Sequence, residues 1–170
     1  SVWIRDLAMV TEGERPIALL EVRSSFHEIF SSVWSGEMEN DSLNKLVLFG
    51  GLQPREVTLI RAYAKYLRQT RIPFSQSYMR QTLTRHPDLA RMLVDLFLEL
   101  FDPDGDGEAD RRADEQVLKI ERQLERVTSL DEDRILRRFL NAIRSTLRTN
   151  YFQVDENGEP KSYLAMRSAS

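Results

Sequence analysis

The chain has 170 residues, of which 41% are hydrophobic, so it can bury about 70% of the surface of its unfolded form in a single core. Its 24 Lys and Arg against 27 Asp and Glu give no overall attraction to nucleic acid or to an anionic bilayer, and no apolar run approaches the roughly 20 residues of a membrane span. The absence of cysteine excludes disulfides and sulfur-bound metals, and two histidines are too few for a histidine-rich metal site.

The N-terminal residues are rich in β-branched and aromatic side chains, which favours a strand over residues 1–12. A lone strand needs a partner, so we expect it to close a preceding domain, or else to pair with the other end of the chain. Helical periodicity then predicts a helix from Pro16 to Gly36. Its inward face should consist of Leu19, Val22, Phe26, Ile29, Phe30 and Val33.

Residues Leu52–Gln69 carry the strongest helical pattern in the chain, and Pro54 is suited to the first turn of that helix. Just before it, Asp41 should cap a short helix that Gly50 and Gly51 end. Apolar residues cover roughly half of the circumference of the longer helix, which suggests packing on two sides. They are Val57, Leu59, Ile60, Tyr63, Ala64, Tyr66 and Leu67, with Arg61, Lys65 and Arg68 on the opposite strip.

Four further helices are predicted between Ser75 and about Arg148. Ser75 should cap the first, which runs to about Arg85, and His86 and Pro87 open the second. The second should be among the most buried elements because of a dense apolar stripe. This stripe consists of Leu89, Met92, Leu93, Leu96, Phe97, Leu100 and Phe101.

The part of the chain after the acidic loop at residues 102–110 is predicted to form two helices and a β-hairpin. The first helix should bury Val117, Ile120, Leu124 and Val127. Ser129 and Glu132 have capping-box spacing at the start of the last helix. This helix should turn Leu136, Phe139, Leu140, Ile143 and Leu147 inward. Alternation from Tyr151 onward predicts the hairpin, with its turn at residues 155–158.

We therefore predict a mainly α fold, with six or seven helices around residues 54–71, a short N-terminal strand and a C-terminal β-hairpin. The expected parts are the strand at residues 1–12, a helical domain at 13–150 and the hairpin at 151–170.

The acidic loop is the strongest chemical signal in the sequence. Asp102, Asp104, Asp106 and Gly107 occupy positions 1, 3, 5 and 6 of an EF-hand loop between two expected helices. Position 12 should be a bidentate Glu but is Ala113, so calcium affinity should be poor. We interpret the loop as an exposed acidic turn, and a stand-alone interaction module that binds calcium remains an alternative.

One arrangement of basic residues allows an alternative function, the binding of nucleic acid. The helices at 54–69 and 75–85 have the order of a helix-turn-helix, with Arg80 and Arg85 available for phosphates, although the net negative charge argues against a nucleic-acid regulator.

The last helix is basic, and an anion site there is one interpretation. The other is simple complementation of the helix dipole, with acids in the first turn and bases later. Spacing places Arg134, Arg137 and Arg144 near one face, and Arg138 and Arg148 elsewhere.

The two histidines, His27 and His86, lie in no catalytic motif, and we expect each to be solvated or capped. No catalytic, cofactor-binding or metal residue is assigned in this chain.

Three blocks of sequence, at residues 33–48, 51–76 and 135–153, occur in an order that resembles the large bacterial NAD-specific glutamate dehydrogenases. Residues 1–11 also resemble the strand that closes the ACT-like regulatory region of that family. The resemblance implies an internal helical segment between the regulatory N-terminal region and the catalytic domain, whose sheet the hairpin would begin.

In that family the segment with the catalytic lysine and the nucleotide-binding domain follow the hairpin, so the resemblance implies that this segment alone is inactive. The implied reaction of the parent enzyme converts L-glutamate, NAD and water to 2-oxoglutarate, ammonia and NADH, with NAD bound elsewhere. The implied partners are neighbouring domains and subunits of a cytoplasmic homo-oligomer, with neither nucleic acid nor membrane.

Overall fold

The structure is a computed structural model that describes residues 23, 27, 29–31, 33–36, 39–70, 72–161 and 163–169. The strand predicted for residues 1–12 lies outside this range. Within the predicted helix 16–36, the described residues up to Trp34 are helical, and Gly36 ends it with a φ of 79°. Ile29 is buried as predicted, but the inward placement of Phe30 is wrong, because its side chain is 49% exposed and stacks on Trp34.

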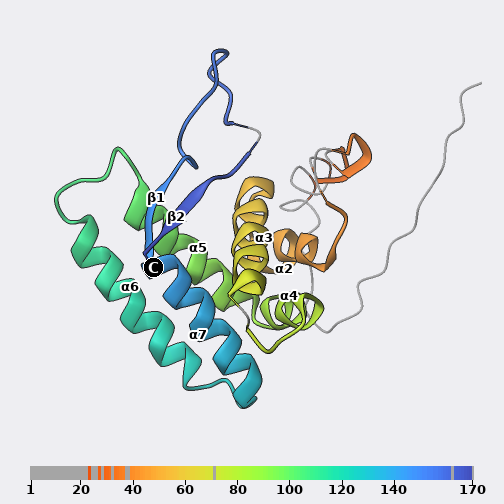
Figure 1. Ribbon diagram of the computed structural model, residues 1–170, viewed down its shortest axis with the longest axis vertical. Helices are drawn as coiled ribbons and strands as arrows, with labels where there is room; N and C mark the ends of the chain where they lie inside the picture. The colour runs from red at the N-terminus through yellow and green to blue at the C-terminus, as the bar shows by residue number, and fades with distance from the viewer. Residues whose placement is uncertain are drawn as a thin grey trace, which may run out of the picture.

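Helices dominate the described part of the chain, and a pair of strands follows them (Figure 1). In chain order the elements are the 3₁₀-helix η1 (Ser42–Asn44), the α-helices α2 (Lys45–Gly50), α3 (Pro54–Gln69), α4 (Gln76–Arg85), α5 (Pro87–Phe101), α6 (Ala109–Leu124) and α7 (Leu130–Arg144), and the strands β1 (Thr146–Thr149) and β2 (Met166–Ser168). The mainly α prediction with a C-terminal hairpin is confirmed.

Side-chain caps fix the starts of η1 and α4 where the sequence predicts them. The Asp41 carboxylate accepts a hydrogen bond from the Leu43 amide at 3.0 Å, and the Ser75 hydroxyl accepts one from the Tyr78 amide at 3.1 Å. Gly51 ends α2 with a φ of 62°, a conformation that glycine adopts without a steric penalty. These local signals are sufficient because each involves groups within three residues of one another.

The core is centred on two helices rather than one. Helix α3 packs against η1, α2, α4, α5 and α7, and α5 packs against α2, α3, α4, α6 and α7. Figure 1 shows α6 along one edge of the helical body and α2 and α4 towards the opposite edge, with the other helices between them. The predicted centre at residues 54–71 is therefore shared with α5.

The predicted apolar faces of α3 and α5 are mostly confirmed. Val57, Ile60 and Phe97 have no exposed surface, and Leu93 is almost completely buried. Leu100 departs from the prediction, because it lies in the last turn of α5 and is exposed. Phe101, the next residue of the stripe, still packs against the core through the Phe97 ring, so Leu100 alone turns outward at this end of the stripe.

The end of α7 differs from the sequence prediction. The helix ends at Arg144 instead of near Arg148, and β1 begins at Thr146, whose backbone pairs with Ser168. Leu147 is not buried as predicted but is 58% exposed. It falls at an irregularity in the strand pairing, and its helical spacing from Ile143 continues a pattern that the backbone no longer follows.

The hairpin reaches from β1 to β2 and extends away from the helices (Figure 1). Its turn lies at residues 155–158 as predicted, where Gly158 has a φ of 81° and donates its amide hydrogen to the Asp155 carbonyl at 3.1 Å. The paired strands lie further from this turn than the sequence suggests, and an isolated bridge between Val154 and Pro160 lies next to it.

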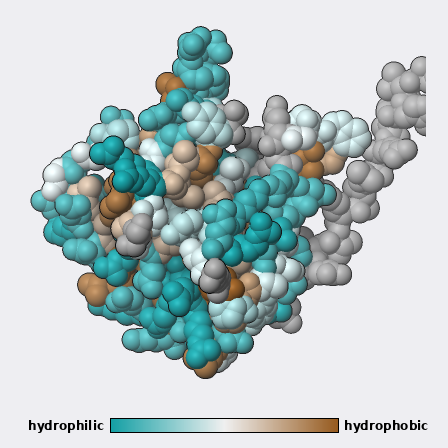
Figure 2. Space-filling view, viewed as in Figure 1, coloured by the Kyte–Doolittle hydropathy of each residue, from teal (hydrophilic) through white to brown (hydrophobic). Residues whose placement is uncertain are grey.

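The surface seen in Figure 2 is mostly hydrophilic, with small, separate apolar patches. None of the described helices has both the length and the apolar character needed to cross a bilayer.

Candidate functional site

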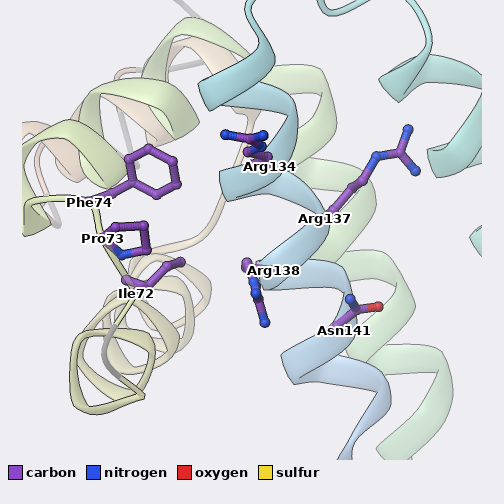
Figure 3. Close-up of a pocket in the computed structure, with 7 residues that line it drawn as sticks. All are labelled: Ile72, Pro73, Phe74, Arg134, Arg137, Arg138 and Asn141. Carbon is purple, nitrogen blue, oxygen red and sulfur yellow. The ribbon is translucent and has the colours of Figure 1, made fainter.

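A surface groove of about 550 Å³ lies between the segment that joins α3 to α4 and one face of α7 (Figure 3). Pro73 cannot continue a helix and Ser75 caps the next one, so the segment Ile72–Phe74 is not helical and forms one wall of the groove. The wall is apolar, whereas α7 supplies basic and amide side chains. The residues that line the groove are Ile72, Pro73, Phe74, Arg134, Arg137, Arg138 and Asn141.

The three arginines of the groove differ in their partners. Arg137 donates to both carboxylate oxygens of Asp133 at 2.9 Å, and in Figure 3 it points away from the apolar wall. Arg134 lies 3.7 Å from Asp131, with both side chains exposed. Arg138 has no ion pair or side-chain hydrogen bond among the described residues. Arg134 and Arg137 of the predicted basic face therefore line the groove, together with Arg138, which spacing placed elsewhere, and the anion site itself stays a prediction.

The remaining arginines of the predicted basic helix lie outside the groove. Arg144 is exposed in the last turn of α7, and Arg148 lies in β1 opposite Arg167 of β2.

A second cluster of contacts fixes the hairpin to the helices. The Tyr63 and Thr146 hydroxyls lie 2.8 Å apart, and Thr146 also donates to the Ala142 carbonyl at 2.9 Å. Because a threonine hydroxyl has one proton, the Tyr63 hydroxyl is the donor to Thr146. Burial raises the pKa of Tyr63 to about 12, so this hydroxyl keeps its proton at neutral pH.

Arg55 of α3 holds the hairpin at a further point. Its guanidinium donates to the backbone carbonyls of Tyr151 and Lys161 and lies 4.8 Å from the centre of the Tyr151 ring. Asn150 is buried and stabilises the base of the hairpin from inside, because its side chain bonds the Tyr163 carbonyl and the Ala165 amide. The hairpin is thus positioned by a few directional contacts.

Glu132 at the start of α7 joins that helix to α4. Its carboxylate lies 2.7 Å from the Arg85 guanidinium and 2.8 Å from the His86 ring nitrogen. These bonds, that with His86 foremost, hold the pKa of Glu132 below its usual value despite burial. Ser129 caps the helix as predicted, but Glu132 does not complete the capping box, because its side chain faces α4.

The basic residues of the predicted helix-turn-helix form ion pairs with acidic residues of the same chain. Arg80 lies 3.3 Å from Asp41, and Arg85 pairs with Glu132. Arg61, expected on a polar strip of α3, is buried and donates to Asp41 at 2.9 Å and 3.1 Å. These pairs use the basic side chains to hold η1, α3, α4 and α7 together.

The acidic loop forms local turns and ion pairs. Asp102 accepts from the Asp104 amide at 3.0 Å, and Asp106 accepts from the Glu108 amide at 3.0 Å and from Arg112 at 2.7 Å. The hydrogen bond from Arg112 is the main cause that lowers the pKa of Asp106.

Ala113, at position 12 of the loop pattern, is a buried residue of α6. No group of three potential metal-ligating side chains occurs in the described part of the chain. His27 is exposed on its helix.

The contacts of Arg61, Arg55 and Glu132 could not be found from the sequence, because their partners are 20 to 106 residues away. Charge pattern identified the basic face of α7, but the apolar wall opposite it comes from another part of the chain. Spacing placed Arg134 and Arg137 on one face, but it added Arg144, which lies outside the groove, and left out Arg138.

Two family models match this chain. The model described as glutamate dehydrogenase, helical motif 3, matches residues 38–103, and the model described as bacterial NAD-glutamate dehydrogenase, catalytic domain, matches residues 119–170. The first match covers η1 to α5 and the second covers the end of α6, α7 and the hairpin. The two segments share one hydrophobic core.

Curated relatives give the same result. An NAD-specific glutamate dehydrogenase of Halomonas elongata is 42% identical over 98% of the chain, one of Pseudomonas aeruginosa is 40% identical over 97%, and one of Mycobacterium tuberculosis is 46% identical over 89%. In each case the chain spans 10% of the relative's length.

Proposed function

Because this chain belongs to the bacterial NAD-specific glutamate dehydrogenases, we propose that it is a non-catalytic helical module of such an enzyme. The module links the regulatory and catalytic regions and holds the hairpin of the catalytic segment in place. The parent enzyme oxidises L-glutamate with NAD and water to 2-oxoglutarate, ammonia and NADH. It acts in the cytoplasm as a homo-oligomer, and NAD binds outside this module.

The observation that carries this proposal is the set of contacts between the two matched segments. Tyr63 and Arg55 of the helical motif bind the hairpin, and Arg85 and His86 bind Glu132 of α7. Side chains fixed by packing and by hydrogen bonds can hold a neighbouring element in a defined position, which a catalytic domain requires for precise geometry.

The first test is made on the full-length enzyme that contains this segment. Arg55→Ala should lower kcat for glutamate-dependent NAD reduction by roughly tenfold, because a displacement of about 1 Å can cost on the order of a hundredfold in rate. Arg68→Ala is the matched control, since Arg68 is an exposed arginine on the same helix. Full activity in both variants would contradict the role of the module in positioning the hairpin.

The second test concerns the parent protein itself. Antibody capture from source cells, followed by denaturing electrophoresis, should give a polypeptide about ten times longer than this chain, as in its relatives. The undenatured capture should reduce NAD in the presence of glutamate, whereas the isolated 170-residue chain should not. Turnover by the isolated chain would show that it carries catalytic residues.

A further inference from the structure

The groove beside α7 combines two surfaces that differ in chemistry. One wall is apolar and includes the half-buried ring of Phe74, and the other presents Arg134 and Arg138 with the amide of Asn141. Figure 3 shows both arginines on the side of α7 that faces the wall. Small-molecule sites have this composition, with a mostly apolar lining and a few polar groups, and typical volumes of about 300–1,000 Å³ include that of the groove.

The charge on the basic wall is only partly balanced within the described residues. Arg134 and Arg138 are four residues apart on one helix face, a spacing at which like charges destabilise a helix. Arg138 has no acidic partner in the described part of the chain, and the pairing of Arg134 with Asp131 is long and exposed. An anion placed between the two guanidinium groups would relieve this repulsion and accept their hydrogen bonds.

The groove lies between the two segments that the family models match. Its apolar wall belongs to the segment that matches the helical motif, and its basic wall belongs to the segment that matches the catalytic domain. A bound molecule would touch both segments at once.

We propose that this groove binds a small organic anion with a flat apolar body and a single phosphate or carboxylate group. The anionic group lies between Arg134 and Arg138, where planar guanidinium groups match the geometry of phosphate and carboxylate oxygens. The apolar body lies against Pro73 and Phe74, where a ring can stack on the aromatic side chain. Charge and apolar contact therefore act together in this site.

Three probes separate these two contributions on the 170-residue chain. Phenyl phosphate has both a ring and an anion, inorganic phosphate has the anion alone, and benzyl alcohol has the ring alone. Isothermal titration calorimetry at low salt should give a Kd for phenyl phosphate at least about tenfold below that for inorganic phosphate, with benzyl alcohol weaker still.

Variants then locate the site. The double variant Arg134→Gln and Arg138→Gln should weaken phenyl phosphate binding at least about tenfold, because it removes the charge-assisted hydrogen bonds of the groove. Arg144→Gln removes an exposed arginine of the same helix outside the groove and should leave the Kd unchanged. All three substitutions are at exposed positions, so circular dichroism should show the same helical content in each variant.

Two results would overturn the proposal. One is equal binding of phenyl phosphate and inorganic phosphate, or of phenyl phosphate and benzyl alcohol, because either would mean that one contribution suffices. The other is an equal loss of binding in the Arg144 and the Arg134–Arg138 variants, which would indicate nonspecific attraction by the basic helix. The binding test uses no enzymatic activity, so its failure is distinct from failure of the proposed function.

Discussion

The helical body and the C-terminal hairpin are stabilised in different ways. Helices α3, α5 and α7 each bury seven or eight residues, whereas β1 buries Thr146 alone and β2 has no buried residue. Apolar burial is non-directional and contributes about 25 cal/mol per Å², so the helices share their stability over many contacts. The hairpin depends on a few directional hydrogen bonds and on the contact of the Tyr151 ring with Phe97, and single changes should move it without unfolding the helices.

The largest effect is expected where both regions meet at one aromatic side chain. Phe97 is fully buried, and its ring centre lies 6.1 Å from that of Tyr63 and 5.2 Å from that of Tyr151. Phe97→Ala should reduce the free energy of unfolding by about 3–5 kcal/mol, because it leaves a cavity in the core. Urea unfolding followed by circular dichroism measures this, and a loss below about 1 kcal/mol would mean that the site collapses or is already loose.

The next effect tests the buried ion pair of the helical body. The side chains of Arg61 and Asp41 are 5% and 10% exposed, and Asp41 also binds Arg80. Asp41→Ala should cost about 3 kcal/mol, because it removes the buried carboxylate that binds Arg61 at 2.9 Å and leaves only the exposed Glu39 at 3.9 Å. Glu39→Ala is the control, since Glu39 is exposed and should change stability by less than about 0.5 kcal/mol. Equal effects of the two substitutions would exclude a special role for the buried pair.

The pKa of the same Asp41 carboxylate predicts how the stability of the protein depends on pH. Burial raises the pKa of Asp41, but the hydrogen bonds and charge of Arg61, with smaller contributions from the Leu43 amide and Arg80, bring it below the usual value of 3.8. A lowered folded-state pKa stabilises the protein above the unfolded pKa, and this stabilisation is lost as pH falls through the folded-state value.

Unfolding measurements between about pH 6 and pH 2 should therefore show stability falling below about pH 4. Asp41→Asn should make this fall shallower, and the residual slope should include Glu132, whose pKa is also lowered. An unchanged slope in Asp41→Asn would contradict the lowered pKa.

A smaller effect is expected for one anchor of the hairpin. Tyr63→Phe removes the hydrogen bond to Thr146, which keeps its bond to the Ala142 carbonyl. The loss should be about 1 kcal/mol, and hydrogen exchange should rise in β1 and β2 more than in α3. Tyr66→Phe on the same helix is the control, because the Tyr66 hydroxyl has no hydrogen bond among the described residues. Uniform acceleration across the helices would show that the anchor is part of the core.

The smallest effect is expected at Leu147. Because its side chain is 58% exposed, Leu147→Ala should change the free energy of unfolding by less than about 0.5 kcal/mol. Leu140→Ala in α7, where the side chain is 3% exposed, should cost about 2–5 kcal/mol. A comparable loss at both positions would support the longer helix that periodicity predicted.

The sequence by itself determined the helices and most of their limits. Proline at a first turn, Ser75 and Asp41 as caps and Gly51 at a helix end act within a few residues, and apolar periodicity identified the buried faces of α3 and α5. Such signals are local, so they can be read before any long-range contact is known.

Only the tertiary structure decided which polar groups meet. Arg61 falls on the polar strip of its helix by spacing alone, yet η1 covers it and Asp41 neutralises it. The end of α7 was likewise decided by pairing with β2, which overrides the helical spacing of Leu147. The groove required the wall at Ile72 to Phe74 to lie beside α7, and no pattern within either segment specifies that neighbour. Chain segments far apart in sequence come together through burial of the shared core, whose driving force is non-directional and therefore does not specify which buried faces become neighbours.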